Sequence, residues 1–471
     1  MKRPPATVVV FLLALGLYAA TTHRRVFIAG NDASRWAAIE SLVDYGTASI
    51  ERSRFAANVD RIRIGEREYS NKPPVLSLAG AAIYAVLQTT FGWSLAGAGA
   101  ANVLYWVTLL LVGVPSAWLV ARFFAELSRF PELDGRWRWL LAGALGAGTL
   151  LFTFSTTLNN HTIAAALLFA AFIAAIDGKG FTSGLAVGLA AAVDLLPGLG
   201  FAPVFGWLLW RGGPRGAAGR FAAGLGCCLV VAGAANLGTH GSPLPAKLVA
   251  GAVDLSAQAG PAAAGVVLPQ NLLYPLEILF GSHGLFTVSP VLIFGAWGLF
   301  SACRRAAPGS RPGPAGDLSA WRLLAAGIAL QVAGHAALAG SFGGWSYGYR
   351  YLLPIQPLLL FCAPWILGRL RRRVLFAVLL PVSVLFAALG AYHPWPPGFE
   401  QESSGHPVAK LVVNPVGGNA AGWLAEHAPQ SAFAGWAAGR FVSADREEQR
   451  RYFALFFGSK GDTATMKRFS D

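Results

Sequence analysis

Apolar runs that are long enough to cross a membrane recur along most of this 471-residue chain. A helix needs about twenty apolar residues to span a hydrocarbon core of roughly 30 Å. The two short runs near the middle, split by Pro197 and Gly198, could instead form a helical hairpin that does not fully span. Counting all runs predicts an all-α polytopic membrane protein with about eleven transmembrane helices. The runs fall near residues 5–22, 99–121, 138–156, 162–177, 181–195, 197–211, 217–236, 284–303, 321–339, 351–368 and 374–391.

Basic residues in the short loops between these runs indicate the orientation of the chain. With a cytoplasmic N-terminus, every strongly basic loop falls on the cytoplasmic side, as the positive-inside rule requires. This arrangement holds only if residues 73–91 do not cross, so we expect them to form a helix that dips into the outer leaflet. We also expect the first run to be an uncleaved helix, and the C-terminus then lies outside. The basic loops contain Arg122, Arg129, Arg136 and Arg138, then Lys179, then Arg211, Arg215 and Arg220, then Arg304, Arg305 and Arg311, and finally Arg369, Arg371, Arg372 and Arg373.

The first external loop, residues 23–98, has structure of its own in this interpretation. Residues 31–45 read as an amphipathic helix that begins at Asn31 and stops at Gly46. Residues 59–69 alternate around Gly65 like a small hairpin. The sequence therefore predicts a membrane domain over residues 1–392, followed by an external tail or small cap over residues 393–471.

Composition and charge narrow the class of protein. The chain is 55% hydrophobic and 13% charged, with a mean hydropathy of +0.51 and a net charge of +14. A soluble domain carries roughly 25% charged residues, so this composition is typical of a membrane protein. The positive charge lies in short loops between apolar runs, which argues against nucleic acid as a partner. The four cysteines lie within or at the end of apolar runs and indicate no disulfide framework.

Two residues of the first external loop are candidates for chemistry. Asp32 opens the amphipathic helix, where a carboxylate either interacts with the helix dipole or serves as a general base. Lys72 lies in the sequence NKPP, between the hairpin and the leaflet-dipping helix. Its ammonium group either snorkels to the interface or contacts a phosphate.

A second set of candidates comes from polar residues at the outer ends of later runs. Arg350, within GSFGGWSYGYRYLLP, lies on the external side against the positive-inside bias, and a lipid phosphate suits its guanidinium fork. The tyrosines of this segment belong either to an aromatic belt at the membrane interface or to a substrate cavity. The two external histidines, His161 and His283, could bind a divalent metal together with Asp32 or Asp194. The alternative is that they are ordinary histidines at the membrane interface. Candidate residues of a substrate cavity are Arg35, Asn160, His161, His283, Tyr347 and Tyr351.

These motifs, in this order and on one side of the membrane, resemble the GT-C class of membrane glycosyltransferases. The closest resemblance is to the protein O-mannosyltransferase and lipid A aminoarabinose transferase group, family 39 and its bacterial relatives, and it covers roughly residues 1–390. It rests on the acidic residue that opens the external helix, on KPP at residues 72–74 and on RYLLP at residues 350–354. The chain departs from the group's pattern at Ala33, Asn71 and the Asn160–His161 pair.

The resemblance implies an inverting transfer of a sugar from a polyprenyl-phosphate donor to an acceptor hydroxyl of a lipid, glycan or protein. The reaction would take place on the external face of a bacterial-type plasma membrane. Asp32 would be the general base, and Lys72 and Arg350 would bind the donor phosphate. An alternative function is a transporter or flippase of lipid-linked saccharides, which more often shows inverted repeats and broken helices. A structural assembly subunit would leave the ordered external motifs unexplained.

Overall fold

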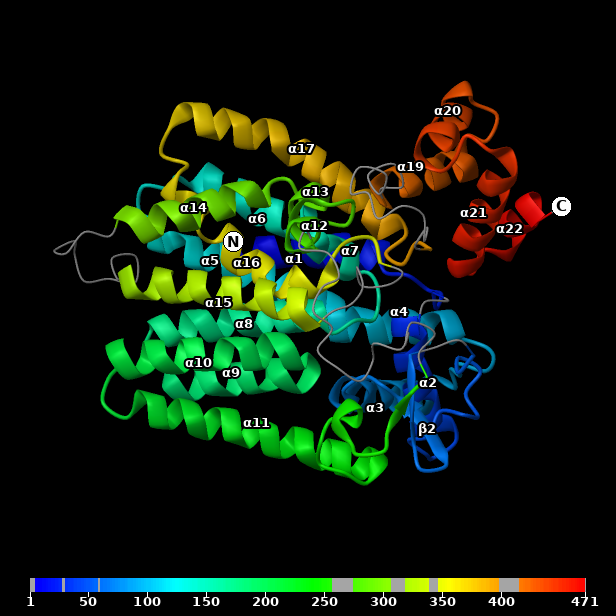
Figure 1. Cartoon of the computed structure of the whole chain (residues 1–471), viewed down its shortest axis with the longest axis horizontal. Coiled ribbons are helices and arrows are strands. Elements are labelled where there is room, and N and C mark those ends of the chain that lie inside the picture. The colour runs from blue at the N-terminus through cyan, green and yellow to red at the C-terminus, as the bar shows by residue number, and fades with distance from the viewer. Residues whose placement is uncertain are drawn as a thin grey trace.

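The computed structural model describes residues 5–27, 30–57, 60–255, 274–305, 318–338, 346–397 and 415–470. Long helices run roughly along one direction, and the hairpin and the C-terminal helices lie at one end of this bundle (Figure 1). The first part of the chain contains helices α1 (Ala6–Thr21), α2 (Gly30–Asp44), α3 (Pro74–Phe91), α4 (Ala100–Thr108), the π-helical turn η1 (Leu109–Gly113), α5 (Val114–Glu126), η2 (Leu127–Arg129), α6 (Gly135–Ala147), α7 (Leu150–Phe154), α8 (His161–Ile176), α9 (Gly180–Val193), α10 (Leu195–Gly212), α11 (Ala217–His240) and η3 (Ala246–Leu248).

The remaining elements complete the bundle and the group of elements at one of its ends. The later helices are α12 (Tyr274–Phe280), α13 (Leu285–Val288), α14 (Leu292–Arg305), α15 (Leu318–Leu338), η4 (Arg350–Ile355), α16 (Gln356–Leu360), η5 (Ala363–Trp365), α17 (Leu370–Tyr392), α19 (Pro415–His427), α20 (Ala432–Phe441), α21 (Arg446–Ser459) and α22 (Thr463–Ser470). The strands are β1 (Arg61–Ile64), β2 (Arg67–Ser70) and β3 (Val253–Asp254).

Several helices are suited to a membrane, which agrees with the predicted all-α membrane protein. Within the described ranges, five helical stretches are long and apolar enough to cross, or six if a bent pair counts as one span. The predicted number of about eleven is not confirmed within these ranges, because helices such as α1, α8 and α9 are apolar but shorter than a full span. The five stretches are Pro74–Phe91, Ala100–Arg129, Ala217–His240, Ala320–Leu338 and Leu370–Tyr392.

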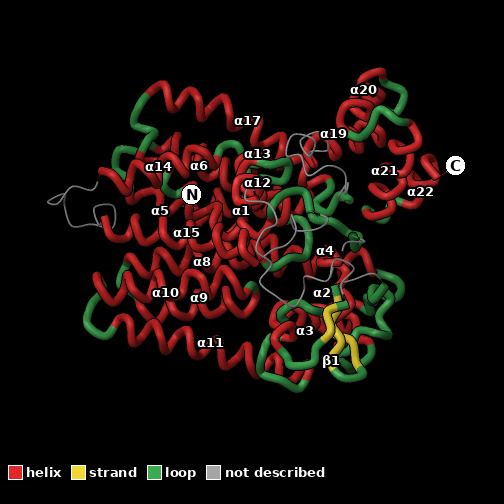
Figure 2. The backbone as a smooth tube through the Cα atoms, in the orientation of Figure 1, coloured by secondary structure: helices red, strands yellow, loops and turns green. Residues whose placement is uncertain are grey.

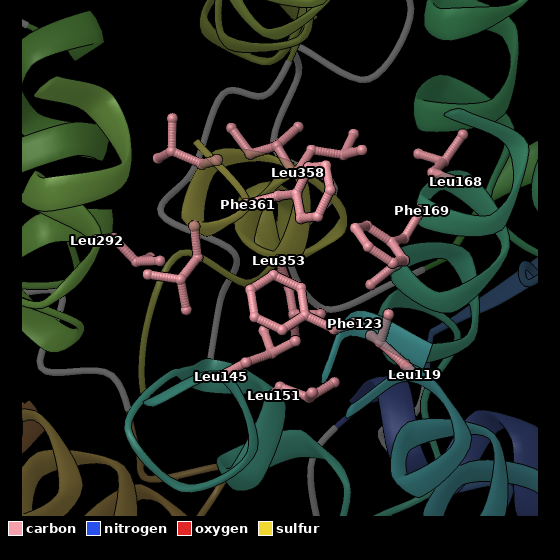
Figure 3. Close-up of a cluster of buried hydrophobic side chains, with 14 of the residues drawn as sticks. Leu119, Phe123, Leu145, Leu151, Leu168, Phe169, Leu292, Leu353, Leu358 and Phe361 are labelled. Carbon is pink, nitrogen blue, oxygen red and sulfur yellow. The ribbon is translucent and has the colours of Figure 1, made fainter. Parts of the chain in front are cut away.

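The run predicted to span over residues 351–368 is not one continuous helix. Arg350–Ile355, Gln356–Leu360 and Ala363–Trp365 are three short helical pieces. Prolines recur along this stretch, and each lacks the N–H that a continuous helix requires. The segment lies inside the bundle instead, where Leu353, Leu358 and Phe361 pack among leucine and phenylalanine side chains of α5, α6, α7, α8 and α14 (Figure 3).

The helices α9 and α10 form the closely packed pair that the short runs suggested, but they separate at a different residue. The break falls at Asp194, which has extended backbone, whereas Pro197 lies in the first turn of α10, where a proline is tolerated. On its other side α9 approaches α11 at backbone contact. A Cβ placed on Gly184 would lie 1.9 Å from the carbonyl oxygen of Phe221. Small residues allow this close approach, as in many membrane helix pairs.

The elements predicted for residues 23–98 are present at one end of the bundle. Strands β1 and β2 pair antiparallel, with Arg61 opposite Ser70, and β3 joins the other edge of β1. Figure 2 shows that the strands are confined to this end. Helix α2 ends before Gly46, whose φ of 63° is suited to glycine. Asn31 is not the residue before the helix, because α2 begins at Gly30.

Helix α3 packs against α2 and near α11 at the same end of the molecule (Figure 1). It is long and apolar enough to cross a membrane, so a dip into the outer leaflet stays a prediction. The helices α19 to α22 have a separate apolar core, in which Tyr452, Phe456 and Phe457 are buried. Residues 398–414, which belong to the predicted tail of residues 393–471, lie outside the described part of the chain.

Candidate functional site

Most of the candidate residues meet at the end of the bundle that carries the hairpin, where α2, α8, the α9–α10 break and η4 come together. We call this group the outer polar cluster, after the external side on which the sequence predicts it. Its side chains are linked by hydrogen bonds, ring contacts or charge interactions over large distances in sequence. The outer polar cluster consists of Asp32, Arg35, Asn160, His161, Asp194, Arg350 and Tyr351.

Asp32 is almost fully buried, and only one of its two oxygens has a partner. The backbone N–H of Phe27 donates to Oδ2 at 3.2 Å. Oδ1 meets no donor in hydrogen-bonding geometry among the described residues. Burial raises the pKa of Asp32 to about 7, although the Phe27 N–H, the charge of Arg35 and the nearby polar groups of Trp36 and Thr157 oppose this shift. A carboxylate with a pKa near neutrality is suited to accept a proton.

Arg35 lies one turn further along α2 and connects this helix to the start of α8. Its Nη2 donates to Oδ1 of Asn160 at 2.6 Å, and its Nη1 donates to the carbonyl and the side chain of Asn31. Burial lowers the pKa of Arg35 to about 10, while Asp194 and Asp32 oppose this effect. The guanidinium therefore stays charged at neutral pH and holds the two helix starts together.

His161 and Asp194 form a close pair across the α8 and α9–α10 elements. Nδ1 of His161 lies 2.6 Å from Oδ2 of Asp194. The histidine ring packs edge-on against Tyr351, with 5.5 Å between the ring centres. Its second nitrogen, Nε2, is buried and has no hydrogen-bond partner among the described residues.

Arg350 is 4% exposed and lies between two aromatic rings. Its Cζ is 4.9 Å from the ring centre of Tyr351 and 5.1 Å from that of Trp395. The ring of His335 also stacks on Tyr351, with 5.3 Å between the ring centres. Aromatic faces attract a cation and fix the plane of a guanidinium. The fork of Arg350 is thereby held in the outer polar cluster.

The loop that leads to Asn160 and His161 is held by residues from both ends of the chain. The backbone N–H of His23 donates to the Thr156 carbonyl at 3.0 Å. The indole N–H of Trp395 donates to Oγ1 of Thr157 at 3.0 Å. These two bonds position the polar residues that follow.

Lys72 lies beside the outer polar cluster and is paired with a residue that sequence reasoning did not select. Its Nζ donates to Oδ2 of Asp60 at 2.6 Å. Burial lowers the pKa of Lys72 to about 8, and Asp60 counteracts this shift. Burial would raise the pKa of Asp60, but Lys72 holds it below its usual value. The hairpin register could have revealed the pair, because Arg61 opposite Ser70 brings Asp60 opposite Asn71, the residue just before Lys72.

Two candidate residues are placed differently from the cluster. The Tyr347 hydroxyl donates to the Phe386 carbonyl of α17 at 2.6 Å, and its ring packs against the backbone of Gly390. His283 accepts the Tyr349 N–H at its backbone carbonyl, at 2.7 Å, and its ring contacts the hydroxyl of Ser282. No described contact links either side chain to Asp32 or His161.

The predicted site for a divalent metal would need several carboxylates and histidines close together. Among the described residues, no group of three His, Cys, Asp or Glu side chains could hold a metal ion. His161 and Asp194 pair with each other instead. The metal therefore receives no support from the described side chains.

The sequence analysis did not select three residues that support the cluster, which are Gln331, His335 and Trp395. His335 follows Gln331 by one helical turn, and the two side chains lie 2.6 Å apart within an apolar helix. Polar residues inside an apolar run are a signal of function that the sequence does contain. Trp395 follows the last apolar run, and nothing in its sequence context indicates that it reaches Arg350.

Comparisons with protein-family models, with curated proteins and with solved structures found no match for this chain.

Proposed function

We propose that this protein transfers a sugar from a polyprenyl-phosphate donor to an acceptor hydroxyl at the outer face of a bacterial-type plasma membrane. The N-terminus would be cytoplasmic, and the outer polar cluster and C-terminus external. The observation that carries the proposal is Asp32, a buried carboxylate with one unpartnered oxygen and a pKa raised to about 7. The acceptor would be a hydroxyl of a lipid, a glycan or a protein.

In the reaction, Oδ1 of Asp32 takes the proton of the acceptor hydroxyl as its oxygen attacks the anomeric carbon. The new C–O bond forms while the bond to the lipid phosphate breaks, so the anomeric configuration inverts. A carboxylate that burial has made more basic, yet that is still largely ionised above pH 7, suits this role. Because the site is partly shielded from water, fixed charges act strongly on the departing phosphate.

Arg350 supports recognition of that phosphate. Its guanidinium is a planar fork that matches phosphate oxygens, and the rings of Tyr351 and Trp395 hold its plane. Lys72 would add a second positive charge, although its ion pair with Asp60 must open or be shared when a phosphate binds. Arg350 is therefore the principal phosphate contact in this proposal.

An apolar cavity lined in part by the segment that follows Arg350 supports a lipid-linked donor. It has a volume of about 410 Å³ and lies between α14, α15 and the segment that follows Arg350. Ile355 and Leu359 line one wall, only a few residues beyond Arg350. A lipid chain in this cavity would place its phosphate end toward the guanidinium. The other lining residues include Leu279, Phe286, Phe300 and Val332.

A transporter or flippase of lipid-linked saccharides is the second candidate. It is favoured by one observation, the bend of 109° between Tyr274–Val288 and Leu292–Arg304, because broken helices are typical of transporters. The concentration of polar residues at one end of the bundle favours surface chemistry over passage through it. The two functions leave different lipids behind. A transferase mutant accumulates donor, whereas a flippase mutant retains its lipid on the inner side.

The test is sugar transfer by the purified full-length protein in lipid vesicles. A panel of radiolabelled polyprenyl-phosphate sugars is offered with extracted envelope lipids, glycans or peptides as acceptors. Asp32→Asn should lower transfer by roughly 10²-fold or more, because the general base is lost. Glu447→Gln, at an exposed site on α21, is the matched control and should keep full transfer. A folded Asp32→Asn variant with near wild-type transfer would contradict the proposal.

A further inference from the structure

Several buried polar atoms of the outer polar cluster lack a hydrogen-bond partner among the described residues. They include Oδ1 of Asp32, which the proposed chemistry uses, and Nε of Arg35 and Nε2 of His161, which it does not use. The His161 residue is 3% exposed, so water does not compensate freely for the missing bond. An unsatisfied buried nitrogen costs free energy, and a ligand that pairs with it recovers that cost.

Asp194 determines which nitrogen of His161 carries the proton. A carboxylate only accepts hydrogen bonds, so Nδ1–H donates to Oδ2 of Asp194 across 2.6 Å. In the neutral imidazole, the lone pair is then left on Nε2. Burial is the main cause that lowers the pKa of His161 and so opposes a second proton on this ring. Arg350, Arg35 and the positive end of the α8 dipole act in the same direction, and Asp194 acts against them. Nε2 is therefore an acceptor, and its natural partner is a hydroxyl donor.

Tyr351 fixes the orientation of this acceptor relative to Arg350. Its ring meets the His161 ring at an interplanar angle of 84°, and the Arg350 guanidinium lies over the same tyrosine. One aromatic side chain thus contacts both the candidate phosphate-binding group and the histidine. A ligand whose phosphate lies on Arg350 would have its neighbouring hydroxyl groups near His161.

We propose that His161, held by Asp194, is a second ligand-binding position, at which Nε2 accepts a hydrogen bond from a substrate hydroxyl. Asp194 is a positioning residue, because it acts through His161. The identity of the ligand as a carbohydrate or hydroxyl acceptor rests on the proposed function. The hydroxyl belongs either to the donor sugar or to the acceptor, and the kinetic test separates these two sources.

The first measurement does not depend on activity. The full-length protein, labelled with ¹⁵N-histidine, is examined by NMR in detergent micelles, and His161→Gln assigns the signal. At pH 7.5 we expect the neutral tautomer with its proton on Nδ1, and in Asp194→Asn a loss of this single tautomer. An imidazolium, or a proton on Nε2, would overturn the proposal whatever the enzyme does.

The second measurement compares two replacements of His161 in the transfer assay. Phenylalanine keeps a ring against Tyr351 but has no acceptor, whereas glutamine can place an oxygen near the Nε2 position. We expect roughly a tenfold loss of kcat/KM in His161→Phe and a smaller loss in His161→Gln, since one hydrogen bond is removed or kept. His427→Gln, at an exposed histidine of α19, is the control. A phenylalanine variant as active as the glutamine variant or better would overturn the proposal.

The source of the hydroxyl follows from the same kinetics. If it belongs to the donor sugar, the donor KM rises and slow donor hydrolysis without acceptor falls in the same proportion. If it belongs to the acceptor, the acceptor KM rises and donor hydrolysis is unchanged. If the wild type transfers no sugar from any donor, the proposed function fails, and the tautomer measurement still decides whether the His161–Asp194 pair is built as described.

Discussion

Lys72 Nζ lies 2.6 Å from Asp60 Oδ2, and this ion pair is mostly shielded from water, with side-chain exposures of 14% and 15%. The lysine is thus held by a protein carboxylate before any phosphate arrives. Its pKa of about 8 lies just above neutrality, and the charge of Asp60 is what keeps it from falling further. The protonation of Lys72 is therefore sensitive to a single neighbouring residue.

We expect Asp60→Asn to move the alkaline limb of the transfer reaction to lower pH. Without the carboxylate, the Lys72 pKa falls below about 8, so fewer molecules carry the ammonium at pH 7.5. The pH profile of kcat/KM measures this shift. Lys72→Arg should move the limb upward, because a guanidinium stays charged. Glu426→Gln removes the carboxylate of a comparable pair with Lys460, in the C-terminal helices, and should leave the profile unchanged.

We expect Asp32→Asn to raise thermal stability in detergent above pH 7. The folded pKa of about 7 exceeds the ordinary value of 3.8, so the wild type loses stability as pH rises from about 4 to 7. The neutral asparagine avoids this loss, which has an upper bound of about 4 kcal/mol at roughly 1.4 kcal/mol per pKa unit. The advantage should shrink toward pH 4. An equal advantage at pH 4 and pH 8 would show that ionisation of Asp32 is not its cause.

Tyr347→Phe should lower stability by about 1 kcal/mol and leave both KM values unchanged. The hydroxyl donates to the Phe386 carbonyl, and the described contacts of this side chain are with α17 and its surroundings. Thermal unfolding and steady-state kinetics test the two parts separately. A changed donor KM with unchanged stability would restore Tyr347 to the substrate cavity, where the sequence pattern placed it.

Gly184→Ala should destabilise the bundle by roughly 1–3 kcal/mol, because its methyl group would meet the Phe221 backbone. The matched control is Gly226→Ala on α11, where an added Cβ meets nothing within 4 Å. That variant should be neutral or slightly stabilising, since alanine favours a helix over glycine. Unfolding in detergent compares the two. Equal effects would mean that the α9–α11 contact is looser than the structure has it.

The sequence was sufficient for local elements and for the grouping of polar residues at one end. The hairpin around Gly65 and the helix before Gly46 follow from alternation and from stop signals that act over a few residues. The membrane topology predicted from the basic loops also placed Asp32 and Arg350 at the same end of the bundle. These features depend on periodicity and charge, which a single chain displays directly.

Other features depend on contacts that no local pattern encodes. The apolar run at 351–368 has the composition of a span, yet its prolines divide it and the bundle buries it. Tyr347 and Tyr351 are four residues apart in one motif. Of the two, only Tyr351 belongs to the outer polar cluster, whereas Tyr347 contacts α17. The pairing of His161 with Asp194 requires that the break between α9 and α10 lies level with the start of α8. Such details follow from packing.

The bond from Trp395 to Thr157 has a consequence for how the protein is made. The two residues are 238 positions apart, so this bond to the loop before His161 cannot form until the chain beyond α17 has been synthesised and has reached this end of the bundle. A nascent chain that ends before residue 395 contains all seven residues of the outer polar cluster and yet lacks the indole that holds both this loop and Arg350. The site is therefore completed only after the last membrane helix is in place.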